Sequence, residues 1–295
     1  MTGAHRLHYA EWGQPDNPRV IVCAHGYSGN ARDFDYLATR LAADARVIAI
    51  DFPGRGNSEW PSSTLEYNFP QFVADARTLI SRLRLKEVDW VGTSMGGLLG
   101  MMLAAQASSP VRRLVMNDIG AYVPLDALQA ISRNVEAPES FASLEDVEAY
   151  LRRARATWGP IADEEWRAMT AHQARPLKEG SRQYRMHYDP RIARVARPMP
   201  LTPGIFFWDS WYRVRCPVLL LRGEHSTIFP ENVARTMVDI RPDARLEVIK
   251  DSGHAPSLMT EDQVARVRNF LHDGGVQAKE RRRDETPPSL PARAA

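Results

Sequence analysis

The chain has 295 residues, of which 44% are apolar and 25% charged, and its formal net charge is +2. This length fits one large α/β domain with an insertion, and the composition is ordinary for a globular protein, which excludes a chain that is disordered throughout. The two cysteines, Cys23 and Cys216, exclude a disulfide scaffold, and the nearly balanced charge gives no reason to expect nucleic acid as a partner.

The distribution of apolar residues does not fit a membrane protein. No apolar run approaches the roughly 18 residues that a bilayer-spanning helix requires. Residues 1–12 lack the apolar centre of a secretory signal. Together with the two unpaired thiols, these features lead us to expect no membrane span and a cytoplasmic location.

Short β-branched runs alternate with amphipathic segments over the first 121 residues, which is the pattern of βα units around a mostly parallel sheet. The apolar runs predict strands at residues 19–24, 46–50, 88–91 and 111–116. Helical spacing predicts a helix over 30–42 that buries Phe34, Leu37, Ala38 and Leu41. It predicts a second helix that buries Phe72, Ala76, Leu79, Ile80 and Leu83. A third helix, rich in small residues, is expected to run through Ala105.

The alternation stops at Tyr122. Between residues 122 and 212 the chain has helical patches, several prolines and many aromatic residues, but no convincing strand. An insertion of about ninety residues is far longer than an ordinary loop. We therefore expect a helical cap over 122–212 that interrupts a core formed by residues 1–121 and 213–273.

Strand and helix patterns resume after the insertion. Strands are predicted at 218–221 and 246–249, and a last helix begins at Thr260, which makes a capping box with Gln263. The inward face of that helix consists of Val264, Val267, Phe270 and Leu271. Residues 274–295 are charged, rich in proline and nearly devoid of large apolar residues, so we expect a disordered tail there.

Two kinds of side chain stand out in the insertion. Its aromatic residues, among them Trp158, Trp166 and Trp211, either roof an apolar pocket or, for most of them, form the small core of a helical subdomain. Seven basic residues between 175 and 197 could attract an anionic substrate. A solvated helix face is the favoured interpretation of that basic run.

The segment Gly92-Thr-Ser-Met-Gly96 fits the sharp strand-to-helix turn that exposes a serine nucleophile. It lies between an apolar strand and a helix of small residues, which is the context that such a turn requires. The alternative is a tight turn whose serine merely caps the helix. The context favours Ser94 as a nucleophile.

A serine hydroxyl needs a base, and His254 is the candidate among the eight histidines. It follows a strand, lies in a glycine-containing loop, and comes after the serine in the chain, as the order of such sites requires. A solvated loop histidine is the alternative interpretation. No pair of histidines has the spacing of a metal site on one helix face, so we predict no metal, and we expect no cofactor.

His25-Gly26-Tyr27 follows the first predicted strand. The backbone N–H groups of Tyr27 and Met95 would together form an oxyanion hole, whereas the alternative is an ordinary strand-to-helix turn. The loop at 51–58 is interpreted as scaffold, in which Asp51 accepts hydrogen bonds from backbone N–H groups.

With these motifs in this order, the chain resembles the α/β-hydrolase-fold superfamily of serine esterases and lipases over residues 6–272. The resemblance rests on His25-Gly26, the loop 51–58, Gly92-Thr-Ser-Met-Gly-Gly97 and Gly253-His254. It implies a mostly parallel central sheet flanked by helices, with the insertion 122–212 at the position of the family's cap. These motifs are specific for the fold and the nucleophile but not for the substrate.

A serine hydrolase of this kind needs a carboxylate that holds the histidine in the correct tautomer. In the family this acid usually follows the strand predicted at 218–221, at the position that Thr227 occupies here. Three alternatives remain: Asp118, at the strand end where some relatives carry the acid; Glu224; or no acid, which would leave only residual catalysis. Asp118 is favoured, although an Asn-Asp pair at a strand end can also serve only to bind loop N–H groups.

The leading hypothesis is a hydrolase of carboxylic esters in which Ser94 forms an acyl-enzyme and His254 acts as the general base. Its partner would be a small ester-like substrate with an apolar acyl group, and the sequence leaves the oligomeric state open. Because Thr227 replaces the expected acid, a non-hydrolytic ligand-binding protein or a weakly active homologue is the main alternative. Lactonases and carbon–carbon bond hydrolases resemble the chain equally well.

Overall fold

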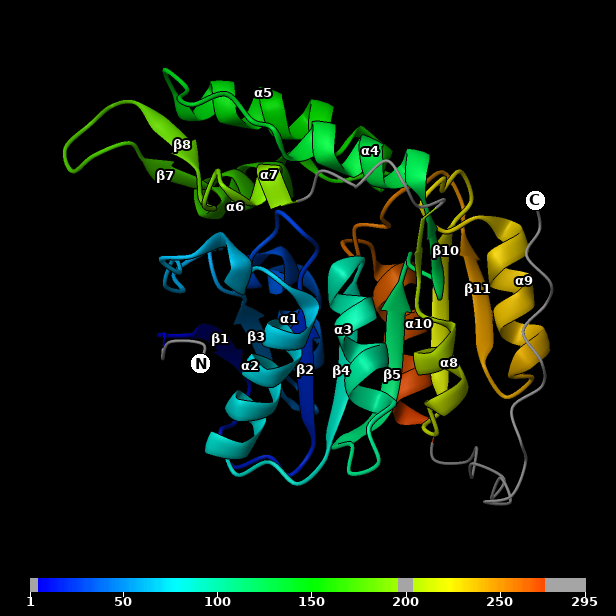
Figure 1. Cartoon of the computed structure of the whole chain (residues 1–295). Helices are drawn as coiled ribbons and strands as arrows, with labels where there is room; N and C mark the ends of the chain where they lie inside the picture. Colours follow the sequence, from blue (N-terminus) through cyan, green and yellow to red (C-terminus); the bar gives the residue numbers. More distant parts are fainter. Residues whose placement is uncertain (1–4, 196–203, 274–295) are drawn as a thin grey trace.

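The computed structural model describes residues 5–195 and 204–273, and a seven-stranded sheet forms its middle layer (Figure 1). The strand order is β1-β3-β2-β4-β5-β10-β11. These strands are β1 (His8–Trp12), β2 (Val20–Ala24), β3 (Arg46–Asp51), β4 (Val88–Thr93), β5 (Val111–Asn117), β10 (Val218–Gly223) and β11 (Arg245–Ile249). Strand β1 is antiparallel to β3 and every other neighbouring pair is parallel. The predicted α/β fold class is confirmed.

Helices cover both faces of the sheet because successive strand residues point to opposite sides. The helices that flank the sheet are α1 (Asp35–Leu41), α2 (Phe69–Arg82), α3 (Met95–Ala104), α8 (Trp208–Arg213), α9 (Glu231–Ile240) and α10 (Glu261–His272). In β4, for example, Trp90 belongs to the core shared with α2 and α3, whereas Val91 belongs to the core shared with α1 and α10. Each strand therefore contributes to two apolar layers.

The sequence pattern predicted most of these elements, and the structure differs from the prediction in two details. The expected helix over 30–42 begins as a 3₁₀ turn, η1 (Ala31–Phe34), which Asn30 and Asp33 close with a capping box. The second short 3₁₀ turn of the core is η2 (Thr64–Glu66). Strand β1 was not predicted, because this edge strand is only partly buried and pairs with β3 alone, so its residues carry no continuous apolar run.

A layer of short elements lies across the carboxyl ends of the parallel strands (Figure 1). It contains α4 (Leu125–Val135), α5 (Leu144–Ala154), η3 (Ala156–Trp158), α6 (Asp163–Gln173) and α7 (Ile192–Val195). It also contains β7 (Ala174–Pro176) paired with β8 (Tyr184–Met186), while β6 (Tyr122–Pro124) pairs with β9 (Gly204–Phe206). The expectation that 122–212 holds no strand was therefore wrong, because strands of three residues are too short to show alternation.

Backbone hydrogen bonds tie this upper layer to the loops at the ends of the strands. Gly56 donates its N–H to the carbonyl of His187 at 2.9 Å, and Asp189 donates to the carbonyl of Gly54 at 2.8 Å. On the other side, the N–H of Gly253 donates to the carbonyl of Thr157 at 2.6 Å. The hydroxyl of Thr157 donates to the carbonyl of His254 at 2.7 Å. The loop that carries His254 is thus held from above.

Two further expectations concern the chain as a whole. Within residues 5–195 and 204–273, no helix is long and apolar enough to cross a bilayer. Both cysteines are free thiols, and burial raises the pKa of Cys216 to about 12. The predicted tail, 274–295, lies outside the described residues.

Candidate active site

Ser94 occupies the turn between β4 and α3. Its φ of 52° and ψ of −116° place it in the left-handed half of the backbone map, where residues other than glycine are strained. The turn is this tight because a Cβ at Gly96 would lie 2.0 Å from the carbonyl oxygen of Ala24, so only glycine lets α3 approach β2. The geometry is that of the strand-to-helix turn that the sequence predicts.

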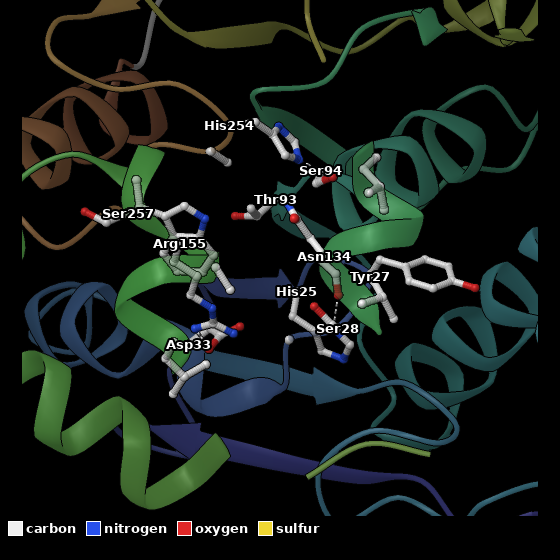
Figure 2. A pocket seen from close by; sticks show the side chains of 18 of the residues that line it. His25, Tyr27, Ser28, Asp33, Thr93, Ser94, Asn134, Arg155, His254 and Ser257 are labelled. Atoms are coloured by element: carbon white, nitrogen blue, oxygen red, sulfur yellow. Dashed lines mark hydrogen bonds and ion pairs between the residues drawn. The ribbon is translucent and has the colours of Figure 1, made fainter. Parts of the chain in front are cut away.

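Three predicted residues form a continuous hydrogen-bonded chain. The Nε2 atom of His254 lies 2.9 Å from Oγ of Ser94, and its Nδ1 atom lies 2.8 Å from Oδ2 of Asp118. Figure 2 shows the imidazole of His254 turned toward Ser94. Ser94 lies at the end of β4, Asp118 at the end of β5 and His254 in the loop after β11. The parallel sheet brings these three strand ends to one edge.

Asp118 is completely buried and held by two further donors. Its Oδ1 atom accepts the N–H of Gly223 at 2.7 Å, and its Oδ2 atom accepts the hydroxyl of Ser226 at 2.6 Å. The Ser226 oxygen in turn accepts the N–H of Phe229 at 3.1 Å, which fixes the direction of its own proton. These two donors fix the orientation of the carboxylate against His254.

The other acid candidates lie elsewhere. Glu224 is exposed, and its Oε2 atom accepts the N–H of Asp251 at 3.3 Å. Thr227 is also exposed, whereas the preceding residue, Ser226, is buried against Asp118. Sequence reasoning missed Ser226, because it gave no signal beyond its position next to Thr227. The non-hydrolytic alternative was motivated by Thr227 at the expected position of the acid. That reason no longer holds, because the carboxylate of Asp118 lies against His254.

The two predicted oxyanion donors flank Ser94. A Cβ at Gly26 would lie 3.7 Å from Cβ of Ser94, so the Gly26–Tyr27 peptide is adjacent to the serine. Met95 follows Ser94 directly and begins α3. In the described part of the chain, neither the N–H of Tyr27 nor that of Met95 donates a hydrogen bond to another residue. Two free donors beside a serine can stabilise a developing oxyanion.

His25 holds the Tyr27 peptide from below. Its ring is fully buried, Nε2 accepts the N–H of Phe52 at 3.0 Å, and Nδ1 therefore donates to the carbonyl of Gly26 at 2.6 Å. Burial lowers the pKa of His25, so the ring stays neutral. The sequence showed only a His-Gly turn, and the two backbone partners of His25 are visible only in three dimensions.

Two histidines, the buried His25 and the half-buried His187, predict how the stability of the fold responds to acid. Burial lowers the pKa of both His25 and His187 in the folded protein, so below about pH 6.5 the unfolded chain binds more protons. We therefore expect the free energy of unfolding to fall from pH 7 to pH 5, by at most about 1.4 kcal/mol per pH unit for each histidine. Urea unfolding at pH 7, 6 and 5 measures this, and His187→Gln should make the dependence shallower. A flat wild-type profile would contradict the prediction.

The loop that follows β3 behaves as predicted. Asp51 accepts the N–H groups of Ala31 at 2.6 Å and Asn57 at 3.0 Å, and its Oδ2 atom lies 2.7 Å from Nδ1 of His8. These bonds hold the turn below His25 in place. Asp51 is therefore part of the scaffold and not of the site.

One cavity is lined by Ser94 and His254 and extends beneath the upper layer. Its empty volume is about 960 Å³ including its open mouth, and its walls come from the strand ends and from α4, α5 and η3 (Figure 2). Apolar walls are formed by Ile131, Val135, Leu151, Ala154, Trp158 and Met186. Trp166 and Trp211 are instead buried in the core, so only some of the insertion's aromatic residues roof the pocket.

Three arginines of the basic run between 175 and 197 contact neighbouring residues, whereas Lys178, Arg182 and Arg194 are exposed. Arg175 and Arg185 both stack on the ring of Trp60, at 5.6 and 4.9 Å from its centroid. Arg191 pairs with Asp189 and donates to the carbonyl of Pro61 at 2.7 Å. These arginines do not line the cavity that contains Ser94, and Arg197 lies outside the described residues.

Comparison with known proteins places the chain among hydrolases. The model of the alpha/beta hydrolase family matches residues 21–267. The chain is 39% identical to a 3-hydroxybutyrate-oligomer hydrolase from Cupriavidus necator, covering 91% of this chain and 94% of that protein. It is 29% identical to a 2-(acetamidomethylene)succinate hydrolase from Mesorhizobium japonicum, over 85% and 87% of the two chains. An alpha/beta hydrolase from Novosphingobium aromaticivorans superposes with a TM-score of 0.79 at 31% identity, covering 90% and 94%.

Proposed function

This chain belongs to the alpha/beta hydrolase family and is a hydrolase, and from that premise we propose that it cleaves carboxylic esters through an acyl-enzyme on Ser94. The observation that carries the proposal is the continuous hydrogen-bonded chain from Ser94 through His254 to Asp118. It ends in a cavity with apolar walls, which fits a small ester with an apolar acyl group.

In the acylation step, Oγ of Ser94 attacks the ester carbonyl while Nε2 of His254 takes the hydroxyl proton. The ionised Asp118 keeps the second ring proton on Nδ1 and stabilises the imidazolium. Negative charge develops on the carbonyl oxygen, and the N–H groups of Tyr27 and Met95 stabilise it. The imidazolium then returns its proton to the leaving alkoxide, and the alcohol departs.

Deacylation repeats the same steps with water as the nucleophile. His254 removes a proton from water, the hydroxide attacks the acyl carbon, and the proton passes to Oγ of Ser94 as the carboxylic acid leaves. The two steps together consume one ester and one water and release one alcohol and one acid. No group beyond these side chains and two backbone amides is needed.

The substrate class that we propose is a short oligomer of a hydroxy acid, after the relative named a 3-hydroxybutyrate-oligomer hydrolase. Such an oligomer is an ester whose alcohol and acyl parts are both small, and it suits a cavity with short apolar walls. The relative covers nearly the whole chain, including the elements that roof the cavity.

The experiment measures initial rates of the purified protein on dimers and trimers of 3-hydroxybutyrate, by acid release in a pH-stat, and on p-nitrophenyl esters of increasing acyl length. We expect turnover of the oligomers and a preference for short acyl chains among the p-nitrophenyl esters. Labelling of Ser94 by a fluorophosphonate, located by mass spectrometry, tests the nucleophile independently. An unlabelled serine and no turnover on either series would refute the proposal.

Ser226 should act as a positioning residue for Asp118. Removing its hydroxyl in Ser226→Ala leaves Oδ2 of Asp118 with one donor fewer, and a hydrogen bond to a charged group contributes about 1.5–3 kcal/mol. About half of that contribution in the transition state corresponds to a fall in kcat of about 4- to 12-fold. Thr227→Ala is the matched control, because Thr227 is adjacent and exposed, and it should retain the wild-type kcat. Equal rates for both variants would contradict the role of Ser226.

A further inference from the structure

Arg155 is the one basic side chain, apart from the histidines, among the described residues that line the cavity of Ser94. It directly follows α5, and its side chain is 8% exposed. In Figure 2 it lies across the cavity from Ser94 and His254, beside Asp33. A guanidinium keeps its charge at every accessible pH, so this cavity contains a permanent cation that the proposed chemistry of Ser94 does not use.

The contacts of Arg155 leave one edge of its guanidinium open. Its Nη1 atom donates to Oδ1 of Asp33 at 3.2 Å and lies 2.5 Å from the sulfur of Met169, while the ring of Trp158 covers one face at 4.3 Å. Within residues 5–195 and 204–273, Nε and Nη2 donate no hydrogen bond. These two N–H groups form the parallel fork that binds a carboxylate in bidentate geometry.

Asp33 fixes Arg155 without occupying that fork. Its Oδ1 atom also accepts the side-chain N–H of Gln173 at 2.7 Å, and its Oδ2 atom accepts the N–H of Asn30 at 3.3 Å. The carboxylate is therefore held by the protein from several sides and touches only one nitrogen of the guanidinium. Nε and Nη2 are not among the buried side-chain atoms that lack a hydrogen-bond partner, so these two donors are accessible to an anionic ligand in the cavity.

We propose that the Nε and Nη2 atoms of Arg155 bind a free carboxylate of the ester substrate, which selects esters of hydroxy acids that end in a carboxylate. This inference rests on the proposed function and adds the group that the substrate must carry. The two parallel N–H donors of one guanidinium match the two oxygens of a carboxylate, which is the anion that a hydroxy-acid oligomer carries at its end. A carboxylate held there fixes the distance from the end of the substrate to the ester that Ser94 attacks.

The test compares the 3-hydroxybutyrate dimer with its terminal carboxamide, which has the same internal ester bond, no second ester and no charge. For the wild type, kcat/KM should favour the free acid by about 10- to 100-fold, mostly through KM, since that is the range of a charge-assisted hydrogen-bonded pair. In Arg155→Met the ratio of the two kcat/KM values should fall to near one. Arg152→Met is the matched control, because Arg152 lies on the same helix, pairs with Glu148 and Asp163, and is absent from the cavity wall; it should keep the wild-type ratio.

The outcomes separate the two proposals. Hydrolysis of both dimers with a wild-type ratio near one, or a ratio that survives in Arg155→Met, overturns the carboxylate subsite and leaves the esterase standing. Cleavage of neither dimer, with Ser94 unlabelled, refutes the proposed function and the subsite with it. If Arg155→Met does not fold, the wild-type ratio still decides. Inhibition by 3-hydroxybutyrate supports it and should be at least tenfold stronger than inhibition by the uncharged 3-hydroxybutyramide.

Discussion

The Ser94→Ala variant should lose about 10⁶-fold in kcat on any ester that the wild type cleaves, which is the scale found when a nucleophile of this type is removed. The loss is this large because the alternative nucleophile, water, is not positioned by the strained turn between β4 and α3. His254 would retain Asp118 but have no hydroxyl to deprotonate. Initial rates at saturating substrate, measured beside the wild type, provide the comparison.

The matched control is Ser132→Ala. Ser132 is a buried serine on α4 that does not line the cavity, so this variant removes the same hydroxyl from a helix of the upper layer and should keep kcat within about threefold. Circular dichroism and the midpoint of thermal unfolding show whether each variant is folded. Undiminished turnover by folded Ser94→Ala would mean that another group attacks the ester.

Replacing Asp118 with Asn should lower kcat by about 10⁴-fold, as in a serine protease that loses its triad carboxylate. An amide in this place is neutral and carries an NH₂ group. That group cannot accept the N–H of Gly223, the hydroxyl of Ser226 and the Nδ1 proton of His254 as the carboxylate does. The imidazole then adopts the other tautomer, and Nε2 no longer accepts the Ser94 proton.

Glu224→Gln separates this effect from a general loss of charge near the site. Glu224 lies in the loop after β10 and does not contact His254, so the variant should retain the wild-type kcat. The pH dependence of kcat/KM for both variants reports the group that titrates in the free enzyme. If Glu224→Gln lowered kcat as much as Asp118→Asn, the assignment of Asp118 as the acid would be wrong.

The elements that the sequence predicted share one property: their pattern repeats over enough residues to be seen. Strand β10 is buried along its whole length. Helix α10 has Thr260 as its N-cap and buries Val264, Val267 and Phe270, which is the face that was expected. Thr260 accepts the N–H of Gln263, which is half of the capping box. Strand β1 and the short strands β6 to β9 have no such repeat, because each is defined by its partner and not by its own residues.

The candidate site divides in the same way. Ser94 and His254 could be named from local sequence, because a tight turn and a glycine-containing loop each leave a motif. The acid could not be named from local sequence, because the choice among Asp118, Glu224 and no acid depends on which strands are neighbours. Strand β10 pairs with β5 in the register Leu221 to Asn117, and this alone places Asp118 beside the loop after β10. Arg155 left no signal either, because its place in the cavity depends on how the insertion folds back over the sheet.

The bonds from Thr157 to the loop of His254 have a consequence for protein engineering. The upper layer cannot be exchanged for that of a relative as an independent module, because the loop that carries His254 is hydrogen-bonded to it. A chimera with the upper layer of a relative would change the wall of the cavity and, at the same time, shift the loop that carries His254. Shifts in substrate preference and losses in turnover would then arise together in hybrids unless residue 157 and its partners were transplanted as one unit.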